Sequence, residues 1–426
     1  MNAPISLAQD RQVASGPRRP LLVKKFGGTS VAGIERMREV ARLALESRDA
    51  GHDVVVVVSA MSGETNRLLA LAHEVQALPD GRELDVLAAT GEQVSCALTA
   101  MCIQARGGKA SSFLGYQVPL ITDDAFTKAR IQKVERDRIR RALAGGRIPV
   151  VAGFQGVDAS QNITTLGRGG SDTTAVALAA ALGAEACEIY TDVDGVYTAN
   201  PRIAPAARKL AAVPYEEMLE LASLGANVLQ VRSVEIAMKY SVPVHVRSSF
   251  TGAEGTWITE RDRALEARAL TGLACVRGQV RVELAGIPAR AAAVADLTGL
   301  LADLNVSADM IGHQRGAGEA KRADIAFTLP ESELPRARPV LERAVAAMGS
   351  GEVRVSKPLA KVSLVGIGVR SDPGVAAHLC RSLVRHGIAV SGLMVSELRI
   401  SCLVDEAEAD RAVALLHDVF GLSQSA

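Results

Sequence analysis

Runs of apolar, β-branched residues recur through the first half of the chain, and each run ends in small polar residues. Such runs occur within residues 21–30, 53–59, 148–156 and 186–197, and a helical pattern from Ile34 to Leu45 follows the first. Uninterrupted apolar strands are typical of a parallel sheet that is buried on both faces. The pattern predicts an open α/β sheet, whose ligands bind at the carboxyl ends of the strands, where the Gly, Ser, Thr and Asp residues fall.

The pattern changes after a strand at Val242–Arg247. Residues 248–267 are rich in Gly, Thr and charged side chains, so we place a domain boundary there. Beyond it, a strand and a helix at 280–303 recur at 361–385, with Leu301 and Leu383 at corresponding positions. Each copy continues with further strands and a helix, which predicts two units of β-α-β-β-α order.

The last strand of the repeat differs between the two units. The first unit ends in a strand at Glu352–Ser356, whereas the second ends at Gly421–Ala426 without one. A strand candidate at Ala269–Val276 precedes the first unit, and we expect the second unit to recruit it. The expected divisions are a disordered tail at 1–20, an α/β domain at 21–250, a linker at 251–268, a joining strand at 269–279, a first repeat unit at 280–356 and a second at 357–426.

Composition and charge argue against a nucleic-acid-binding protein and against a membrane protein. The chain is 48% apolar but only 3% aromatic, so its core must be built from Ala, Val, Leu and Ile. A net charge of +1 gives no electrostatic footprint for nucleic acid or an anionic membrane. No apolar stretch approaches the roughly 20 residues of a membrane helix. Scattered cysteines without a C-x-x-C pair, and no signal peptide, favour a cytoplasmic protein, and the histidines show no metal-ligand spacing.

The most informative polar segment is Thr164–Thr174, which runs into the helix-forming segment Ala175–Leu182. Its glycines allow a ligand to approach the backbone closely, and the start of the helix favours an anion. Arg168 can hold a carboxylate or phosphate bidentately, while Asp172 can hold an amine. The segment therefore suits an α-amino acid beside a phosphate, and the alternative is a solvated glycine-rich turn with a Ser/Asp cap.

A second anion site is predicted where the first strand ends. A lysine precedes Gly27 and Gly28, although the chain has no G-x-x-x-x-G-K-[ST] loop. Because a strand alternates its faces, either Lys24 or Lys25 could be the functional lysine, and the motif register favours Lys25. Phosphoryl transfer to a carboxylate needs no strong base, since the acceptor is already ionised at neutral pH. Such a site must hold two anions and stabilise charge on the transferred group.

Six motifs in order resemble the aspartate kinase family, and the resemblance covers roughly Leu21 to the C-terminus. The motifs are Lys25–Ser30 (KFGGTS), Val58–Asn66 (VSAMSGETN), Thr90–Ser95 (TGEQVS), Gly153–Gly156 (GFQG), Thr165–Thr174 (TLGRGGSDTT) and Thr191–Arg202 (TDVDGVYTANPR). The resemblance implies a three-layer α/β/α amino-acid-kinase domain of carbamate-kinase-like fold, followed by two ferredoxin-like ACT units that bind amino acids. It also implies a homo-oligomer, a dimer or higher, paired through the ACT units.

The implied activity is ATP-dependent phosphorylation of the L-aspartate side chain to 4-phospho-L-aspartate, the entry to lysine, threonine and methionine synthesis. The implied partners are L-aspartate and ATP, with Mg²⁺ carried on the nucleotide and no metal site of the protein's own. Two alternatives are a non-catalytic amino-acid sensor with a decayed kinase domain and another amino-acid or carbamate kinase of the same fold.

The resemblance also implies roles for individual residues. It assigns the catalytic roles to Lys25, Arg168 and Asp172. It assigns substrate binding to Ser59, Thr65, Glu92, Gly153, Phe154, Arg168, Gly169, Gly170 and Ser171. It assigns nucleotide binding to Lys25, Phe26, Gly27, Gly28, Ser59, Ser171, Thr191, Asp192, Tyr197 and Arg202. Lys25, with the amides of Gly27 and Gly28, would stabilise the transferred phosphoryl group.

In the same scheme Arg168 would take the α-carboxylate of the substrate, and Glu92 and Asp172 its ammonium group. Each role has a structural alternative. Glu92 could complement a helix dipole, and Asp192 and Asp194 could form a turn before Gly195. Tyr197 could belong to the core and Arg202 to a solvated surface.

The sequence departs from the family pattern in regions that bear on regulation. Asn227 stands where relatives usually have a nucleotide-binding lysine. The Asp-x-Pro-Gly turn of the first ACT unit falls on Ala289–Ala292, whose alanines favour continuing the helix. The second unit keeps this turn at Ser371–Gly374. We therefore expect effector binding at Asp372 and Gly374 and not in the first unit.

Overall fold

The computed structural model describes residues 19–118, 120–226, 228–261, 270–290, 292–315 and 322–424. Residues 1–18 of the expected tail, residues 262–269, Ala291 and Asn227 therefore lie outside the described residues. The chain divides into two compact units. The first comprises residues up to 196, 209–223 and 227–266, and the second comprises residues 197–208, 224–226 and 267–426.

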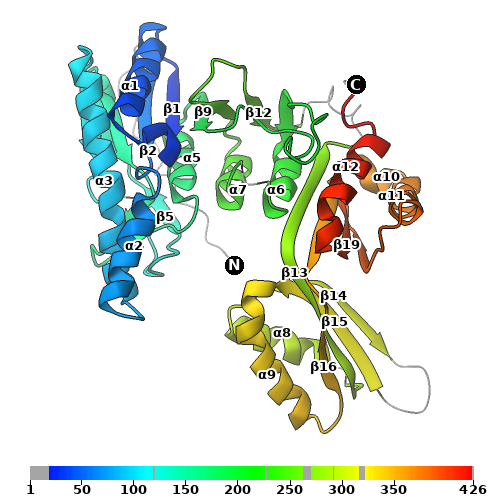
Figure 1. Ribbon diagram of the computed structural model, residues 1–426. Helices are drawn as coiled ribbons and strands as arrows, with labels where there is room; N and C mark the ends of the chain where they lie inside the picture. Colours follow the sequence, from blue (N-terminus) through cyan, green and yellow to red (C-terminus); the bar gives the residue numbers. More distant parts are fainter. Residues whose placement is uncertain are drawn as a thin grey trace. The chain divides into compact units, whose positions relative to one another are not determined.

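The first unit is built on an eight-stranded sheet with the strand order β10-β12-β11-β9-β1-β2-β6-β3 (Figure 1). Four short strands form a second sheet with the order β5-β4-β7-β8. The strands are β1 (Leu21–Phe26), β2 (Asp53–Val58), β3 (Ala110–Phe113), β4 (Leu120–Thr122), β5 (Ile131–Val134), β6 (Ile148–Ala152), β7 (Gln155–Val157), β8 (Ile163–Thr165), β9 (Ala186–Thr191), β10 (Ala212–Pro214), β11 (Val244–Ser248) and β12 (Thr256–Thr259).

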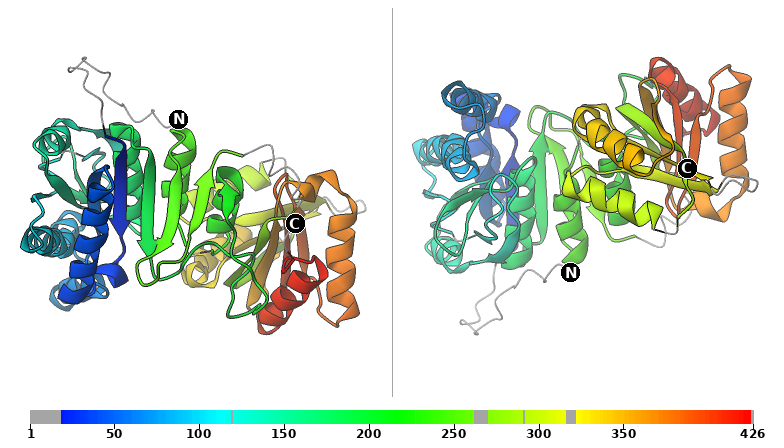
Figure 2. Two further views of the ribbon diagram at one scale, coloured as in Figure 1. Left: turned by 90° about the horizontal axis from the view of Figure 1, so that it is seen from above. Right: turned by 90° about the horizontal axis from the view of Figure 1, so that it is seen from below.

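Helices cover the large sheet on both faces, as the views in Figure 2 show. They are η1 (Gly28–Val31), α1 (Ile34–Asp49), α2 (Glu64–Val75), α3 (Gly81–Ala105), α4 (Asp137–Ala144), α5 (Gly170–Leu182), α6 (Tyr215–Ser223) and α7 (Val231–Lys239). Val54, Val56 and Val58 of β2 pack into one core with α1 and α3, while α5 contacts β1, β2 and β9. Because both faces of β2 are covered, each of its valines is buried, which explains the uninterrupted apolar run.

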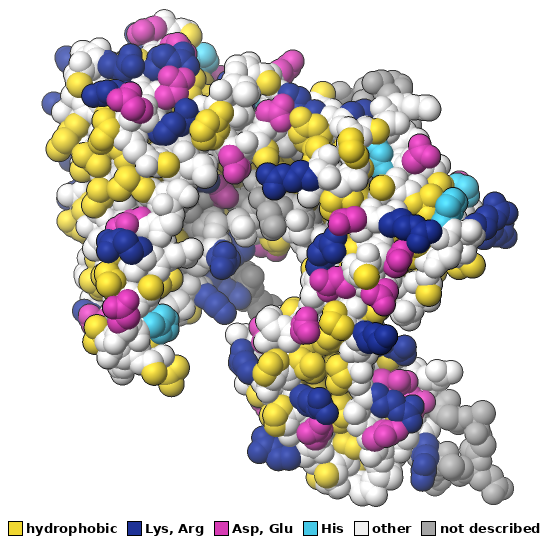
Figure 3. All heavy atoms as spheres, in the orientation of Figure 1, with side chains coloured by type: hydrophobic (Ala, Val, Ile, Leu, Met, Phe, Trp, Pro, Cys, Tyr) yellow, Lys and Arg dark blue, Asp and Glu magenta, His cyan; other side chains and the backbone are white. Residues whose placement is uncertain are grey.

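Apolar side chains gather over α1 and α3 on the face seen in Figure 3. Ile34, Val94 and Met101 of these two helices are exposed. Among the described helices, α3 is the one whose length and apolar composition would suit a membrane crossing, and 56% of its most apolar window is buried inside the structure. Cys96, Ala100 and Ile103 of α3 pack in the core of the unit.

The second unit contains the two repeat units and joins them in one sheet, with the order β14-β15-β13-β17-β19-β18 and with β16 paired to β13. Its strands are β13 (Gly272–Pro288), β14 (Asp309–Arg315), β15 (Arg322–Pro330), β16 (Glu352–Val355), β17 (Leu359–Val365), β18 (Gly392–Val395) and β19 (Arg399–Asp405). Its helices are α8 (Ala293–Asp303), η3 (Glu331–Glu333), α9 (Leu334–Ala347), α10 (Gly368–Ser371), α11 (Gly374–Arg385), η4 (Glu406–Glu408) and α12 (Ala409–Val419).

The long strand β13 serves both repeat units. Its first half pairs with β17 from Gly272 to Val276, and its second half pairs with β15 and β16. The pairing with β17 is the recruitment that the sequence pattern led us to expect. The pattern was wrong in separating two strands, since the chain continues through Gly278, which has a φ of +62°. Only a shift in pairing register between Val276 and Gln279 marks the junction.

Each repeat unit has its own core. Phe327 and Leu341 pack with β13, β15, α8 and α9 in the first, and Leu364 and Leu379 pack with β17, β19, α11 and α12 in the second. The segment 197–208 belongs to this second core, because Ala199 and Ala204 lie within it. Tyr197 and Arg202 are thus residues of the second unit.

Two expectations from the sequence need correction. The expected linker at 251–268 contains β12, which pairs with β11 and β10 of the large sheet. This strand was missed because it is short and lies among Gly and charged residues. The first repeat unit's helix begins at Ala293 and does not extend back through Ala289 and Ala292, since the Arg290 N–H donates to Pro288 in a turn that precedes the helix.

Candidate active site

The carboxyl ends of four neighbouring strands are joined by backbone hydrogen bonds at one edge of the large sheet. The N–H of Ser59, just beyond β2, donates to Phe26 O of β1 at 3.1 Å. The N–H of Gly153, just beyond β6, donates to Val58 O at 3.0 Å, and the N–H of Gly27 donates to Tyr190 O of β9 at 3.1 Å. The predicted site residues at these strand ends therefore lie side by side, as parallel strands require.

Lys25 is buried at this edge and faces α5. Its Nζ lies 2.5 Å from Oδ1 of Asp172, which is in the first turn of α5. Both residues are less than one-tenth exposed. A buried charge is stable only beside its counter-charge, so each side chain fixes the position of the other. The expectation that Asp172 also binds the substrate ammonium group stays a prediction, and one oxygen of its carboxylate is already paired with Lys25.

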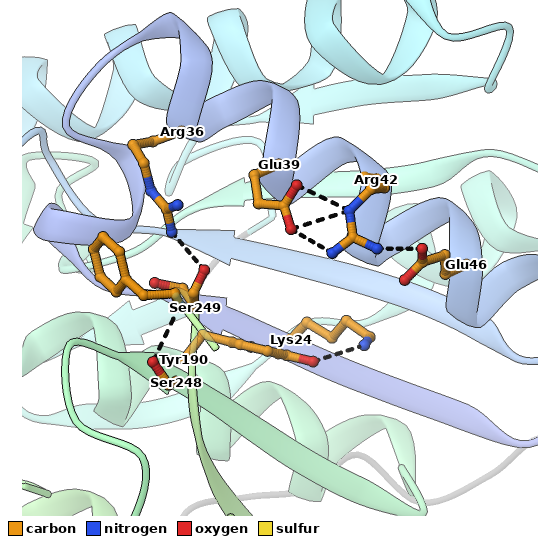
Figure 4. A network of polar contacts seen from close by, with 9 residues as sticks. Lys24, Arg36, Glu39, Arg42, Glu46, Tyr190, Ser248 and Ser249 are labelled. Atoms are coloured by element: carbon orange, nitrogen blue, oxygen red, sulfur yellow. Dashed lines mark hydrogen bonds and ion pairs between the residues drawn. The ribbon is translucent and has the colours of Figure 1, made fainter. Parts of the chain in front are cut away.

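Lys24 points to the opposite face of β1 from Lys25, because successive residues of a strand alternate between its faces. Figure 4 shows the Lys24 side chain directed toward Tyr190. Its Nζ lies 2.6 Å from Glu188 Oε2 and donates to the Tyr190 hydroxyl at 3.2 Å. Burial lowers the pKa of Lys24, and the carboxylate of Glu188 opposes that effect. Arg247 also pairs with Glu188, at 3.2 Å. Lys24 is therefore part of a buried charge network that lies on the other face of the sheet from Asp172.

Glu92 combines deep burial with an unused oxygen. It lies in the middle of α3 and not at its start, which excludes the alternative that it complements the helix dipole. Its Oε1 accepts the Ala60 N–H at 2.9 Å, while Oε2 is buried and accepts no hydrogen bond from the described residues. Burial raises the pKa of Glu92 to about 7, although the bond from Ala60 opposes the shift.

The segment Gly167–Gly170, called the Gly-rich segment below, leads into α5. Two of its glycines have backbone angles in the left-handed region. Gly167 has a φ of +76° and Gly169 a φ of +68°, and the exposed Arg168 lies between them. A Cβ at Gly169 would overlap the side chain of Gln230, so this position cannot carry a larger residue without a shift. The same holds for Gly170, where a Cβ would lie 2.8 Å from the ring of Phe154.

Other predicted residues pack around this segment. A Cβ at Gly153 would lie 2.8 Å from Cβ of Ser171, and the Phe154 N–H donates to Thr174 Oγ1 at 3.2 Å. A Cβ at Gly28 would lie 2.9 Å from Ala60 O, which brings the Gly-Gly turn against the segment that also binds Glu92. Lys25, Gly28, Ser59, Glu92, Gly153, Phe154, Ser171 and Asp172 thus form one cluster through these contacts.

Two assigned nucleotide contacts are not supported by the geometry. The Phe26 side chain is fully buried and stacks on Tyr190 with 4.7 Å between ring centroids, while its carbonyl is taken by Ser59. The Gly27 N–H is taken by Tyr190, so it is not free for a phosphate. Both residues support the strand ends from within.

The remaining predicted residues are less closely tied to the cluster. Thr65 is half-buried on α2, and Thr191 at the end of β9 donates to Asp192 Oδ1 at 3.1 Å. Asp194 pairs with Lys209 at 3.2 Å, which supports a structural role for it. Tyr197 and the exposed Arg202 belong to the second unit. Among the residues that the structure describes, no group of three or more His, Cys, Asp or Glu side chains could hold a metal ion.

Sequence reasoning missed Asp85 and Arg232, whose side chains hold the backbone just before the Gly-rich segment. Asp85 accepts hydrogen bonds from Thr127 and Thr165, and Arg232 donates to Leu166 O and Ala129 O. No local pattern could have identified them, because their partners are backbone atoms far away in sequence.

Comparisons with known proteins agree with this arrangement. The model of the amino acid kinase family matches residues 20–248, and an ACT domain model matches residues 362–420. The aspartate kinase of Stutzerimonas stutzeri is 46% identical over 407 residues, which cover 95% of this chain and 98% of that protein. The chain belongs to the aspartate kinase family. The aspartokinase of Mycolicibacterium smegmatis is also 46% identical, over 94% of this chain and 96% of that protein.

Solved structures of aspartate kinases have the same fold. Escherichia coli aspartokinase III in complex with aspartate and ADP matches with a TM-score of 0.77 and 27% identity, covering 94% of this chain and 100% of that chain. The aspartate kinase of Synechocystis matches with a TM-score of 0.53 and 40% identity, covering 95% of this chain and 70% of that chain. The predicted kinase domain with two ACT units is confirmed by these matches.

The two adjacent lysines provide a first test. Lys25→Ala should lower kcat by a factor equivalent to about 3 kcal/mol, because it removes a charge directed at the transferred group. Lys24→Ala should leave kcat per folded molecule near normal but lower the free energy of unfolding by roughly 2 kcal/mol or more, because Glu188 loses a buried partner. A coupled ADP-release assay and thermal unfolding measure both. A Lys25→Ala enzyme with normal kcat and only a raised KM would contradict the assignment.

The raised pKa of Glu92 predicts that the kcat/KM for aspartate depends on pH. With a pKa raised to about 7, its carboxyl is protonated below that pH and cannot pair with an ammonium group. The kcat/KM for aspartate should therefore fall as the pH decreases through about 7, while the KM for ATP changes little. Glu92→Gln should have a low kcat/KM for aspartate without this inflection. Persistence of the same inflection in Glu92→Gln would show that another group titrates.

Proposed function

We propose that this chain transfers the γ-phosphoryl group of ATP to the side-chain carboxylate of L-aspartate, giving 4-phospho-L-aspartate and ADP. The observation that carries the proposal is the buried Lys25–Asp172 pair, which lies where the carboxyl ends of the strands meet the start of α5. An ammonium group held there suits the negative charge that develops as a phosphoryl group moves between two anions.

The acceptor oxygen needs no base, because the aspartate side chain is ionised at neutral pH. It attacks the γ-phosphorus of ATP while the bond to the bridging oxygen breaks, and the electron pair leaves with ADP. In this scheme Lys25 stabilises the transferred group, and Asp172 keeps the Lys25 ammonium directed into the site. Burial strengthens the interaction of Lys25 with the phosphoryl oxygens, because bulk water screens it less.

Aspartate would be bound by its two α-substituents. Arg168 is exposed on the Gly-rich segment, and its guanidinium suits the α-carboxylate. Oε2 of Glu92 is buried and accepts no hydrogen bond within the part of the chain that the structure describes, and it suits the ammonium group. An enzyme that reads both groups leaves only the side-chain carboxylate of aspartate free to react.

Nucleotide binding would fall to the turn after β1 and to the end of β9. A Cβ at Gly28 would lie 2.9 Å from Ala60 O, so a glycine lets this turn pack against the segment that follows β2. We propose that the backbone of this turn contacts the phosphates. Ser59, Ser171, Thr191 and Asp192 provide hydroxyl and carboxylate groups in the same unit. The family resemblance adds Tyr197 and Arg202 to the proposed nucleotide contacts. Mg²⁺ would arrive with the nucleotide, held mainly by the phosphates of ATP, and it would neutralise phosphate charge.

We also propose that the enzyme is cytoplasmic and forms homo-oligomers through its ACT units. Ile311 on β14 and Leu393 and Val395 on β18 are exposed apolar residues on the two edge strands of the ACT sheet. Unpaired edges with apolar side chains suit pairing with a second copy.

The overall reaction can be tested with an ADP-release assay that compares aspartate, glutamate and buffer. Release only with aspartate supports the proposal. Release with glutamate or with bicarbonate and ammonia would indicate another kinase of the same fold, and no release with binding of amino acids to the ACT units would indicate a sensor.

Arg168→Lys should raise the KM for aspartate on the order of tenfold or more, because a single ammonium cannot reproduce bidentate geometry. The KM for ATP should not change. An aspartate analogue that is amidated at the α-carboxyl should be a poor substrate of the wild type and should discriminate little between wild type and variant. An equal loss on both substrates would exclude the α-carboxylate role.

From the turns of the two ACT units we expect threonine and lysine to inhibit the enzyme only weakly. The first unit lacks the Pro and Gly of its turn, whereas in the second the Gly374 N–H donates to Asp372 Oδ1 at 2.7 Å. We expect residual effector binding to depend on Asp372, with Asp372→Ala weakening it and Asp372→Asn, which can still cap α11, retaining more of it. Titration of each amino acid and of both together, by activity and by calorimetry, measures this. Strong concerted inhibition that Asp372→Ala leaves unchanged would contradict it.

A further inference from the structure

Asp85 is a buried carboxylate whose described partners are hydrogen-bond donors of a turn residue, Thr127, and of the last residue of β8, Thr165. It lies in the second turn of α3 and is 1% exposed. Its Oδ1 accepts the Thr127 N–H at 3.0 Å and the Thr165 hydroxyl at 2.6 Å. Its Oδ2 accepts the Thr127 N–H at 2.9 Å and the Thr165 N–H at 2.8 Å. Burial raises the pKa of Asp85, and these hydrogen bonds oppose the shift.

Arg232 of α7 provides the complementary contacts to the same two segments. Its guanidinium donates to Leu166 O at 2.6 Å and to Ala129 O at 2.9 Å. The segments are also joined directly, because the Ala129 N–H donates to Thr165 O at 2.9 Å. A carboxylate thus satisfies N–H groups of these segments and a guanidinium satisfies their carbonyl groups. Charge-assisted hydrogen bonds of this kind are the strong ones in proteins.

One of the two residues that Asp85 binds, Thr127, has an unfavourable backbone conformation. Thr127 has a φ of +68°, which is rare and strained for a β-branched residue. The position is tightly packed, since a Cβ at Gly167 would lie 3.1 Å from Thr127 O. The two hydrogen bonds from the Thr127 N–H to Asp85 favour this conformation over relaxed ones.

These contacts stop one residue short of the segment that carries Arg168. Leu166 is fixed by Arg232 and by its own N–H, which donates to Phe154 O at 2.8 Å. Gly167, Arg168 and Gly169 follow, and glycines leave a backbone free unless its ends are fixed. At the other end, the Gly170 N–H donates back to Gly167 O at 2.9 Å. The direction in which Arg168 leaves the sheet therefore depends on how firmly Thr165 and Leu166 are held.

We infer that Asp85 is a positioning residue for aspartate binding, which acts by fixing Thr127 and Thr165 and thereby the segment that presents Arg168. The inference rests on the proposed role of Arg168 toward the α-carboxylate of aspartate. Asp85 itself does not touch the substrate in this scheme. Its loss should affect aspartate more than ATP, because the turn after β1 is not held by Asp85.

Asp85→Asn is the informative variant. An amide keeps the size of the side chain but replaces one acceptor oxygen with a donor, which then opposes N–H groups. A misplaced binding group can cost up to about a hundredfold, so we expect the aspartate KM to rise on the order of tenfold to a hundredfold with little change in the KM for ATP. Thr165→Val removes only the hydroxyl bond to Asp85 and should raise the aspartate KM less than Asp85→Asn does. Thr165→Ser keeps the hydroxyl and should have an aspartate KM close to that of the wild type.

Asp158→Asn is a matched control. Asp158 is a buried carboxylate in the turn between β7 and β8, and it accepts the N–H groups of Ser160 at 2.9 Å and Asn162 at 2.8 Å. Its other oxygen, Oδ2, accepts the side-chain amide of Asn162 at 2.9 Å. Asp158→Asn therefore replaces an acceptor oxygen with a donor, as Asp85→Asn does, but at the opposite end of β8 from the Gly-rich segment. We expect Asp158→Asn to lower stability without changing the aspartate KM.

Hydrogen exchange and a double variant separate this inference from the proposed function. Faster amide exchange across 164–170 in Asp85→Asn, but not in Asp158→Asn, supports the positioning role whatever the substrate is. If Asp85 acts through Arg168, Asp85→Asn should raise the aspartate KM less in an Arg168→Lys background than in the wild type. If Arg168→Lys alone has no effect on aspartate, the proposed function of Arg168 fails. The inference about Asp85 is overturned if Asp85→Asn and Asp158→Asn lower the melting temperature alike while exchange at 164–170 and the aspartate KM stay unchanged.

Discussion

The ion pair between Lys25 and Asp172 is the contact on which the arrangement of the candidate site depends. Both side chains are buried, and a charge in such a position is destabilising without a close counter-charge. The pair therefore holds the end of β1 against the first turn of α5. Because α5 directly follows the Gly-rich segment, the same contact fixes one end of the loop that carries Arg168, and Asp85 and Arg232 fix the other.

The two adjacent lysines of β1 have different roles on the two faces of the strand. Lys24 stabilises the fold, and Lys25 is the lysine proposed to take part in the reaction. Lys24 is satisfied by Glu188 and Tyr190, so its charge is fully used within the fold. Lys25 has one carboxylate partner at the strand end and retains donor capacity for a phosphate. Because successive strand residues point to opposite faces, a shift of one residue in β1 would exchange these roles. The pairing of β1 with β2 and β9 along its whole length prevents such a shift.

The apolar runs were sufficient to predict the parallel sheet, and the family motifs were sufficient to place Ser59, Gly153 and Lys25 at one edge, since parallel strands end together. The motifs could not separate ligand contacts from internal supports. Phe26 and Gly27 belong to the motif, yet the structure uses them to join β1 to β2 and β9. Asp85 could not be predicted from the motifs, because it supports the site but belongs to none of them. Its partners are backbone groups about forty and eighty positions away, and no sequence pattern records such contacts.

The shared strand β13 connects the ACT units to the segment 197–208, which carries Tyr197 and Arg202. The Leu273 N–H of β13 donates to Thr198 O at 2.7 Å, and Thr198 Oγ1 lies 2.9 Å from His417 Nε2 of α12. A Cβ at Gly272 would lie 2.7 Å from Thr198 O, so β13 and Thr198 are packed too closely for a side chain at this position. Thr198 is the neighbour of Tyr197, a proposed nucleotide contact. A ligand that displaces β13 or α12 must therefore move Thr198 as well, because packed elements shift together and do not deform independently. Since β13 continues into the core of the first ACT unit, that unit remains coupled to the same segment even if it binds no effector of its own.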